Sequence, residues 1–119
     1  MRPRFLLDEH INHAVQRQLH RLSMEVDVLV IGERNAPAKG TLDPALLLWL
    51  EANEYILVTE NRNTMPAHLA DHFEKGRHIP GILWIRPDVS LGEIIEELYL
   101  IWQVSTADEY QDQALFIPL

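Results

Sequence analysis

The sequence alternates short apolar runs with segments whose apolar residues recur at helical spacing. The short runs are rich in Val, Ile and Leu, as strands buried within a sheet are, and they cover residues 4–7, 25–32, 55–59, 81–87 and 114–119. The helical segments cover residues 10–22, 42–53, 66–76 and 90–104. This alternation predicts a three-layer α/β fold, with a central, mainly parallel sheet flanked by helices through right-handed crossovers.

Length and charge limit the classes of function that the chain can have. With 119 residues, of which 47% are hydrophobic, we expect a single folded domain over residues 1–119. The chain carries 18 acidic and 10 basic residues, a net charge of −8. This charge argues against broad binding to nucleic acid, which needs a basic face. It leaves room for a nuclease whose acidic cluster holds metal ions, because the cation then contacts the phosphate.

The sequence contains no targeting or membrane signal. No apolar run reaches the roughly 18 residues of a membrane span, and we expect no contact with a membrane. The start "MRPRFLLDEH" has too short an apolar run for a signal peptide. The chain has no cysteine, which excludes disulfides and thiolate metal sites and fits a cytoplasmic protein.

Three local signals predict where helices begin and end. Asp43 precedes Pro44, which favours Asp43 as the N-cap of the second helix and Pro44 as its first residue. Ser90 and Glu93 have the spacing of a capping box at the start of the fourth helix. Gly76 is typical of a residue that closes a helix, here the third.

Polar residues follow the first and third apolar runs. Asp8 and Glu9 come directly after the first run, and the segment Glu60–Asn63 follows the third. If these strands are neighbours in a parallel sheet, both groups meet at its carboxyl edge, where open α/β sheets bind ligands. Asp8 could then hold a hard divalent cation such as Mg²⁺ or Mn²⁺. The alternative is that Asp8 merely ends its strand or caps the next helix.

The other polar residues near this edge have similarly divided interpretations. Asp43 is explained by helix capping, although it could also lean into the site. Asn61 and Asn63 could ligate a cation through their carbonyl oxygens, or could simply form a turn. Arg62 could place a positive charge in the pocket and contact a phosphate. Glu60 is adjacent to Asn61, but neighbouring strand residues point to opposite faces.

A separate motif, "HLADH", lies in the third helical segment. His68 and His72 are four residues apart and share one helix face, with Asp71 beside them. Imidazole groups suit zinc or nickel, so these three residues form a candidate transition-metal site. Exposed histidines on an amphipathic helix are the alternative.

Three stretches together carry a resemblance to a known family. "FLLDEHINHAVQRQLH", "DVLVIGE" and "LDPALLLWLEANEYILVTENRNT" resemble, in order and spacing, the compact PIN-like proteins. These are relatives of PIN-domain ribonucleases and of the toxin nucleases of bacterial toxin–antitoxin pairs. The resemblance covers about residues 4 to 85 and implies a PIN-like fold.

The resemblance assigns positions to individual residues. Asp8 matches the first metal-site aspartate of the family, and Asp43 matches the acidic residue that opens its second helix. Asn61 and Asn63 occupy two further positions where the family has aspartates, and Thr64 replaces an aromatic residue. PIN-type hydrolysis uses clustered carboxylates to hold Mg²⁺ or Mn²⁺, which activates water against an RNA phosphodiester. The two asparagines remove two negative charges from this cluster and weaken its hold on a metal.

Three hypotheses for function follow. The first is a metal-dependent ribonuclease, acting as the toxin of a toxin–antitoxin pair, with catalytic and substrate-binding residues Asp8, Asp43, Asn61, Asn63, Arg62, Glu9 and Glu60. The second is a catalytically inactive PIN-like domain that serves as a binding or regulatory partner. The third is the transition-metal module of the "HLADH" motif. The resemblance further implies RNA as substrate, a small antitoxin as partner, and a homodimer.

Overall fold

The computed structural model describes residues 1–119, and its centre is a five-stranded sheet in the order β2-β1-β3-β4-β5. Every neighbouring pair of strands is parallel. The strands are β1 (Phe5–Leu7), β2 (Val28–Val30), β3 (Ile56–Thr59), β4 (Ile82–Ile85) and β5 (Ala114–Ile117). The helices are α1 (Ala14–Leu22), α2 (Asp43–Asn53), α3 (Met65–Glu74), α4 (Leu91–Val104) and the short 3₁₀ helix η1 (Ala107–Tyr110).

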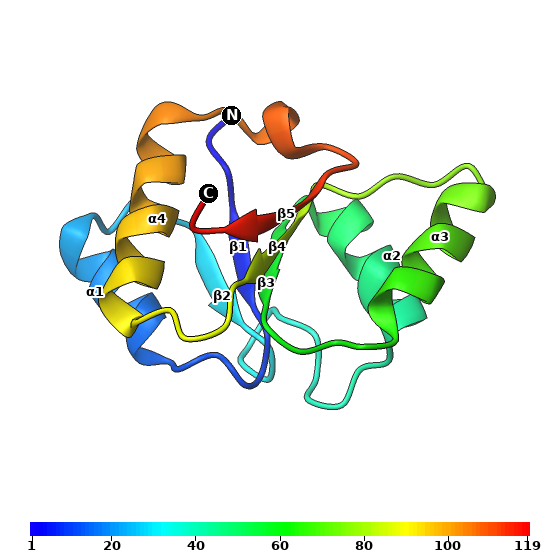
Figure 1. Cartoon of the computed structure of the whole chain (residues 1–119), viewed down its shortest axis with the longest axis horizontal. Helices are drawn as coiled ribbons and strands as arrows, with labels where there is room; N and C mark the ends of the chain where they lie inside the picture. Colours follow the sequence, from blue (N-terminus) through cyan, green and yellow to red (C-terminus); the bar gives the residue numbers. More distant parts are fainter.

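The helices cover both faces of the sheet, which confirms the predicted three-layer α/β arrangement. Helices α1 and α4 lie on one face, and α2 and α3 on the other (Figure 1). Each face has its own core of buried apolar side chains, because residues of a fully covered strand alternate between the two layers. None of the helices combines the length and apolar composition that crossing a membrane requires.

The last crossover differs in hand from the two before it. The chain moves in one direction through the sheet from β2 to β3, β4 and β5. Helices α2 and α3 accompany this path on one face, whereas α4 packs with α1 on the opposite face. The four crossovers therefore do not all have the same hand. The prediction that all of them are right-handed is wrong for the crossover from β4 to β5. The reason is that the apolar stripe of α4 joins the α1 core, so that β5 has no helix of its own on the α2/α3 face.

Two of the three predicted helix signals are confirmed. The Ser90 hydroxyl accepts a hydrogen bond from the Glu93 backbone N–H at 3.2 Å, as an N-cap does. Gly76 follows α3 with a φ of +77°, the left-handed conformation that glycine adopts freely. The capping role of Asp43 is wrong: Leu42 occupies the N-cap position, and Asp43 is the first residue of α2 with no capping hydrogen bond. Its carboxylate accepts hydrogen bonds from Arg62 and Thr64 instead.

Candidate functional site

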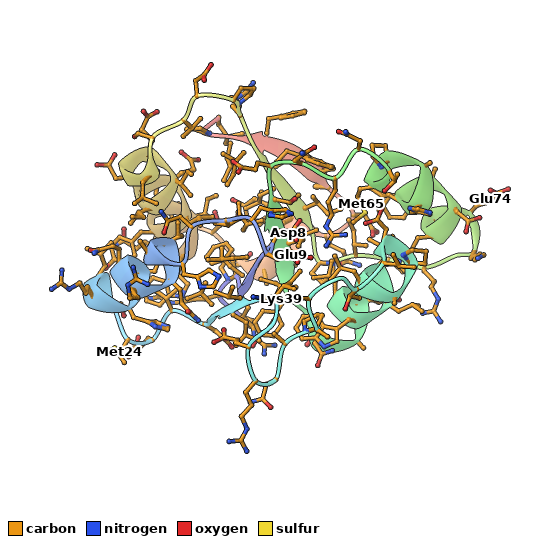
Figure 2. The ribbon with its side chains drawn as sticks, turned by 90° about the horizontal axis from the view of Figure 1, so that it is seen from below. Asp8, Glu9, Met24, Lys39, Met65 and Glu74 are labelled. Carbon is orange, nitrogen blue, oxygen red and sulfur yellow. The ribbon has the colours of Figure 1, made fainter.

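The candidate site lies at the carboxyl edge of the sheet, where β1 and β3 end side by side. The parallel pairing of β1 with β3 brings Asp8, just after β1, close to the segment that follows β3. Figure 2 shows Asp8 and Glu9 near the middle of the molecule, between the two helical layers. Asp43 reaches the same place from the start of α2. The predicted meeting of the two polar strand ends is therefore observed.

Arg62 bridges the two aspartates. Its Nε donates to Asp8 Oδ2 at 2.7 Å and its Nη2 to Asp8 Oδ1 at 3.1 Å, so that the guanidinium grips one carboxylate with two hydrogen bonds. Its Nη1 donates to Asp43 Oδ1 at 2.6 Å. Asp8 is 4% exposed and Asp43 is 5% exposed, so both charges are withdrawn from water. Buried charges of this kind need a paired partner, and Arg62 is that partner.

Asp8 has two further hydrogen-bond donors. The hydroxyl of the fully buried Thr59 donates to Oδ2 at 2.7 Å, and the backbone N–H of Glu9 donates to Oδ1 at 2.8 Å. Burial raises the pKa of Asp8, but the hydrogen bonds from Arg62, Thr59 and the Glu9 backbone outweigh it. The pKa of Asp8 therefore lies below its ordinary value.

Asp43 is held in the same manner. Thr64 Oγ1 donates to Asp43 Oδ2 at 2.5 Å, and His68 Nδ1 lies 2.9 Å from the same oxygen. Burial raises the pKa of Asp43, and the hydrogen bonds from Thr64, His68 and Arg62 lower it to below its ordinary value. With the partners of Asp8, this leaves every oxygen of the two carboxylates hydrogen-bonded.

We expect the free energy of unfolding to decrease as the pH falls below about 4, because of this cluster. The pKa values of Asp8 and Asp43 are lower in the folded state, so the unfolded chain binds protons first. Their contribution is complete above the unfolded pKa and is lost as the pH falls through the folded pKa. Urea unfolding at a series of pH values measures this dependence. The Asp8→Asn variant should show a shallower decrease than the unchanged protein, and equal slopes would contradict the prediction.

The bridged residues line an open, polar cavity of about 660 Å³. Glu9 and Arg62 lie on its wall, and Glu9 Oε1 accepts a hydrogen bond from the Gly40 backbone N–H at 3.2 Å. Asn61 and Asn63 also line the cavity, but both are exposed and their side chains make no hydrogen bond to the protein. Glu60 lines a smaller neighbouring cavity of about 210 Å³ instead. The predicted site residues therefore share one edge of the sheet, except that Glu60 lies apart.

The side chains at this edge do not fit a divalent cation. The two carboxylates and the guanidinium together carry one net negative charge, and Arg62 stands between the oxygens that a metal would need. A second cation would be repelled by Arg62 at close range. No three side chains of His, Asp, Glu or Cys are arranged so that they could hold a metal ion. This arrangement differs from the cluster of free carboxylates that the resemblance implied for Mg²⁺ or Mn²⁺.

The "HLADH" residues do not form one cluster. His68 faces Asp43, whereas His72 is buried with its Nε2 3.0 Å from the His78 carbonyl oxygen and 3.2 Å from a Glu51 carboxylate oxygen. Asp71 forms an exposed ion pair with Lys75, one turn further along the helix. The three residues serve three different contacts, so the geometry does not favour a transition-metal module.

Comparison of the chain with protein-family models, with curated proteins and with solved structures finds no match. The resemblance to the PIN-like family therefore stays a prediction.

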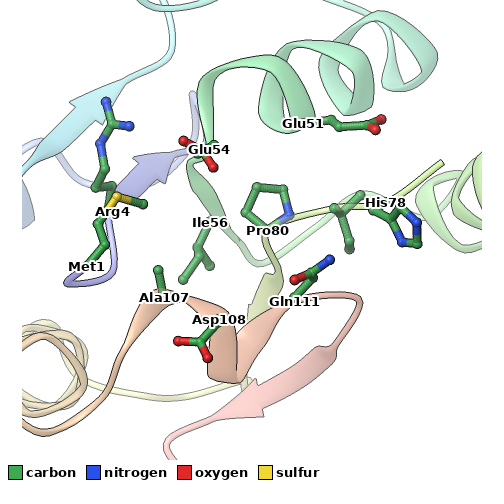
Figure 3. A pocket seen from close by; sticks show the side chains of 11 residues that line it. Met1, Arg4, Glu51, Glu54, Ile56, His78, Pro80, Ala107, Asp108 and Gln111 are labelled. Atoms are coloured by element: carbon green, nitrogen blue, oxygen red, sulfur yellow. The ribbon is translucent and has the colours of Figure 1, made fainter.

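A second cavity, of about 390 Å³, lies at the opposite edge of the sheet (Figure 3). It is lined by residues at the amino ends of the strands, among them Arg4 before β1 and Pro80 before β4. Open α/β sheets bind ligands at the carboxyl edge. We therefore take the cavity beside Arg62, and not this one, as the candidate functional site.

Two threonines of the site were missed by sequence reasoning. The apolar pattern places Thr59 in the third strand without a further role, and the family resemblance marks Thr64 only as a departure from its aromatic residue. Thr59 is the last residue of β3, and its register partner in β4 is Trp84. A buried threonine at the end of an otherwise aliphatic strand was the available signal, because a buried hydroxyl needs a hydrogen-bond partner.

Proposed function

We propose that the chain is a PIN-like domain in which Arg62 takes the place of the divalent cation, so that the domain binds a partner and does not hydrolyse RNA. The observation that carries this proposal is the bridge from Arg62 to both Asp8 and Asp43. A guanidinium can hold two carboxylates together as a metal ion does. It cannot lower the pKa of a bound water in the way a metal does.

The electrostatics favour a protein partner over RNA. The positive charge of Arg62 is neutralised by its two carboxylate partners, and Glu9 adds a further acidic group to the cavity wall. The whole chain carries a net charge of −8. An RNA phosphate would meet net negative charge at the site and over the molecule, which opposes binding. Two of the five N–H groups of Arg62 have no protein partner and can donate to a ligand.

The position of the site supports the link to the PIN-like family. Asp8, Asp43, Asn61 and Asn63, which match four acidic positions of that family, all line one cavity at the carboxyl edge of a parallel sheet. A role in a toxin–antitoxin pair, a small antitoxin as the partner and a cytoplasmic location stay predictions that follow from the resemblance and from the composition. Metal-dependent ribonuclease activity, which the resemblance also implies, is the alternative to this proposal, and a measurement of Mn²⁺ binding distinguishes the two.

Calorimetric titration of Mn²⁺ into the protein is the decisive measurement. We expect no binding at micromolar metal, because the carboxylate oxygens are already hydrogen-bonded and Arg62 repels a cation. The Asp8→Asn variant is the matched control, since it keeps the shape of the side chain and removes one charge. Both proteins should give the same heats, equal to those of dilution.

Micromolar binding by the unchanged protein that Asp8→Asn abolishes would overturn the proposal. Arg62 would then have to move aside for the metal, and cleavage of RNA in Mn²⁺ would become the expected activity. In that case the cleavage must also disappear in Asp8→Asn, because a surviving activity would come from a contaminant.

A further inference from the structure

Strand β5 is an edge strand whose outer side has no partner in the chain. It pairs only with β4. The backbone of Gln113 and Ile117 bonds to β4, through Ile82 N–H to the Gln113 carbonyl and Arg86 N–H to the Ile117 carbonyl. Because successive residues of a strand point their backbone groups to alternate sides, those of Ala114 and Phe116 point outward. The N–H and C=O groups of these two residues, four groups in all, are therefore free to hydrogen-bond to another strand.

The side chains on this edge are also uncovered. Phe116 is 54% exposed, and its ring centre lies 6.4 Å from that of Trp84 on β4. Trp84 packs on the α2/α3 side of the sheet, which the last crossover leaves without a helix over β5. Ala114 is exposed and lies on the same face as Phe116, two residues away.

We propose that β5 pairs with β5 of a second copy of this chain, antiparallel and about a two-fold axis, to form a continuous ten-stranded sheet. In the register centred on Leu115, Ala114 lies opposite Phe116 of the second copy, and Phe116 opposite its Ala114. All four outward backbone groups of each strand are then hydrogen-bonded. The large Phe116 ring lies across from a small alanine, so the two edges fit each other on the exposed face.

Neighbouring registers are less favourable. Moving the axis toward the C-terminus would place Ala114 opposite Pro118, which has no N–H to donate. Moving it the other way would place Phe116 opposite Asp112, whose N–H already donates to the Ile79 carbonyl at 2.9 Å. The register centred on Leu115 is thus the one that leaves no outward group of the pair unsatisfied.

Charge also favours a second copy as the occupant of this edge. The chain has a net charge of −8, so most contacts between two copies would bring acidic groups together. The segment from Gln113 to Leu119 contains no charged side chain. Pairing at β5 therefore joins the two copies along a segment without charged side chains.

The mass in solution, measured by sedimentation equilibrium over a range of concentrations, tests the proposal. We expect a species of twice the 13.8 kDa chain mass, which Phe116→Lys converts to monomer. Leu100→Lys is the control, because Leu100 is a similarly exposed apolar residue, at 52%, but belongs to helix α4 and not to the edge strand. A monomer at all concentrations, or a dimer that survives Phe116→Lys, would overturn the proposal.

The lack of cysteine in the chain allows a test of the register. In the proposed register, Leu115 lies opposite Leu115 of the second copy in a non-hydrogen-bonded pair. The Cα atoms of such a pair are about 4.5 Å apart, which is within the range of a disulfide. Leu115→Cys should form a disulfide-linked dimer on mild oxidation. Phe116→Cys should not, since two such cysteines would be offset along the strands. Equal cross-linking of the two variants would overturn the register.

Discussion

Replacing Arg62 by alanine is expected to lower the free energy of unfolding by about 3–5 kcal/mol. The change would leave the carboxylates of Asp8 and Asp43 buried together without their cation. Their mutual repulsion and lost hydrogen bonds would raise both pKa values, so the variant should also be less sensitive to acid than the unchanged protein. Urea unfolding followed by circular dichroism gives the free-energy difference.

Arg77→Ala is the control for this experiment. Arg77 also forms an ion pair with a carboxylate, Glu51, at 3.2 Å, but its side chain is 49% exposed, so its loss should cost no more than about 1 kcal/mol. Mn²⁺ should raise the melting temperature of Arg62→Ala and leave that of Arg77→Ala unchanged, because only the first variant frees the paired carboxylates. Equal losses of stability in the two variants would show that the bridge does not stabilise the fold.

The second large effect is expected for Gly81→Ala, at about 2–4 kcal/mol of lost stability. Gly81 has a φ of +146°, a conformation that residues with a Cβ rarely adopt. A Cβ built there would lie 2.9 Å from the Tyr110 carbonyl oxygen and 3.0 Å from its Cβ. The backbone around η1 would have to move, just before the chain enters β5.

Gly92→Ala is the matched control for the glycine experiment. Gly92 lies in the first turn of α4, and a Cβ there meets no atom within 4 Å. The change should stabilise the protein by a few tenths to about 1 kcal/mol, since alanine favours a helix and restricts the unfolded chain. Thermal unfolding of both variants measures the contrast. A loss of stability for Gly92→Ala as large as that for Gly81→Ala would refute the steric explanation.

Much of the fold was predictable because it depends on local patterns. The periodicity of apolar residues indicated the strands and helices, and their alternation indicated a parallel sheet with helices on both faces. The N-cap at Ser90 and the glycine after α3 were also predictable, because each acts within one helical turn. Even the edge of the sheet that holds Asp8 followed from the order of the elements.

The site itself was only partly predictable. The sequence pointed to Asp8 as a metal ligand, to Asp43 as a helix cap or a second metal-site residue, and to Arg62 as a phosphate contact. Arg62 lies 54 residues from Asp8 and 19 from Asp43 along the chain. A long side chain can contact any of several charged neighbours, and the choice depends on distances that are set only when the strands pair. The periodicity of apolar residues does not contain this information.

Local spacing of apolar residues is enough to specify a parallel α/β sheet with its polar strand ends at one edge, because burial follows that spacing. Two features depend on long-range packing instead. The first is the position of the Arg62 guanidinium between Asp8 and Asp43. Buried carboxylates need a paired cation, and pairing of the strands brings Arg62 next to both. The second is the position of α4 beside α1, because helices pack where their apolar stripes match. This packing leaves β5 without a helix on the α2/α3 face of the sheet.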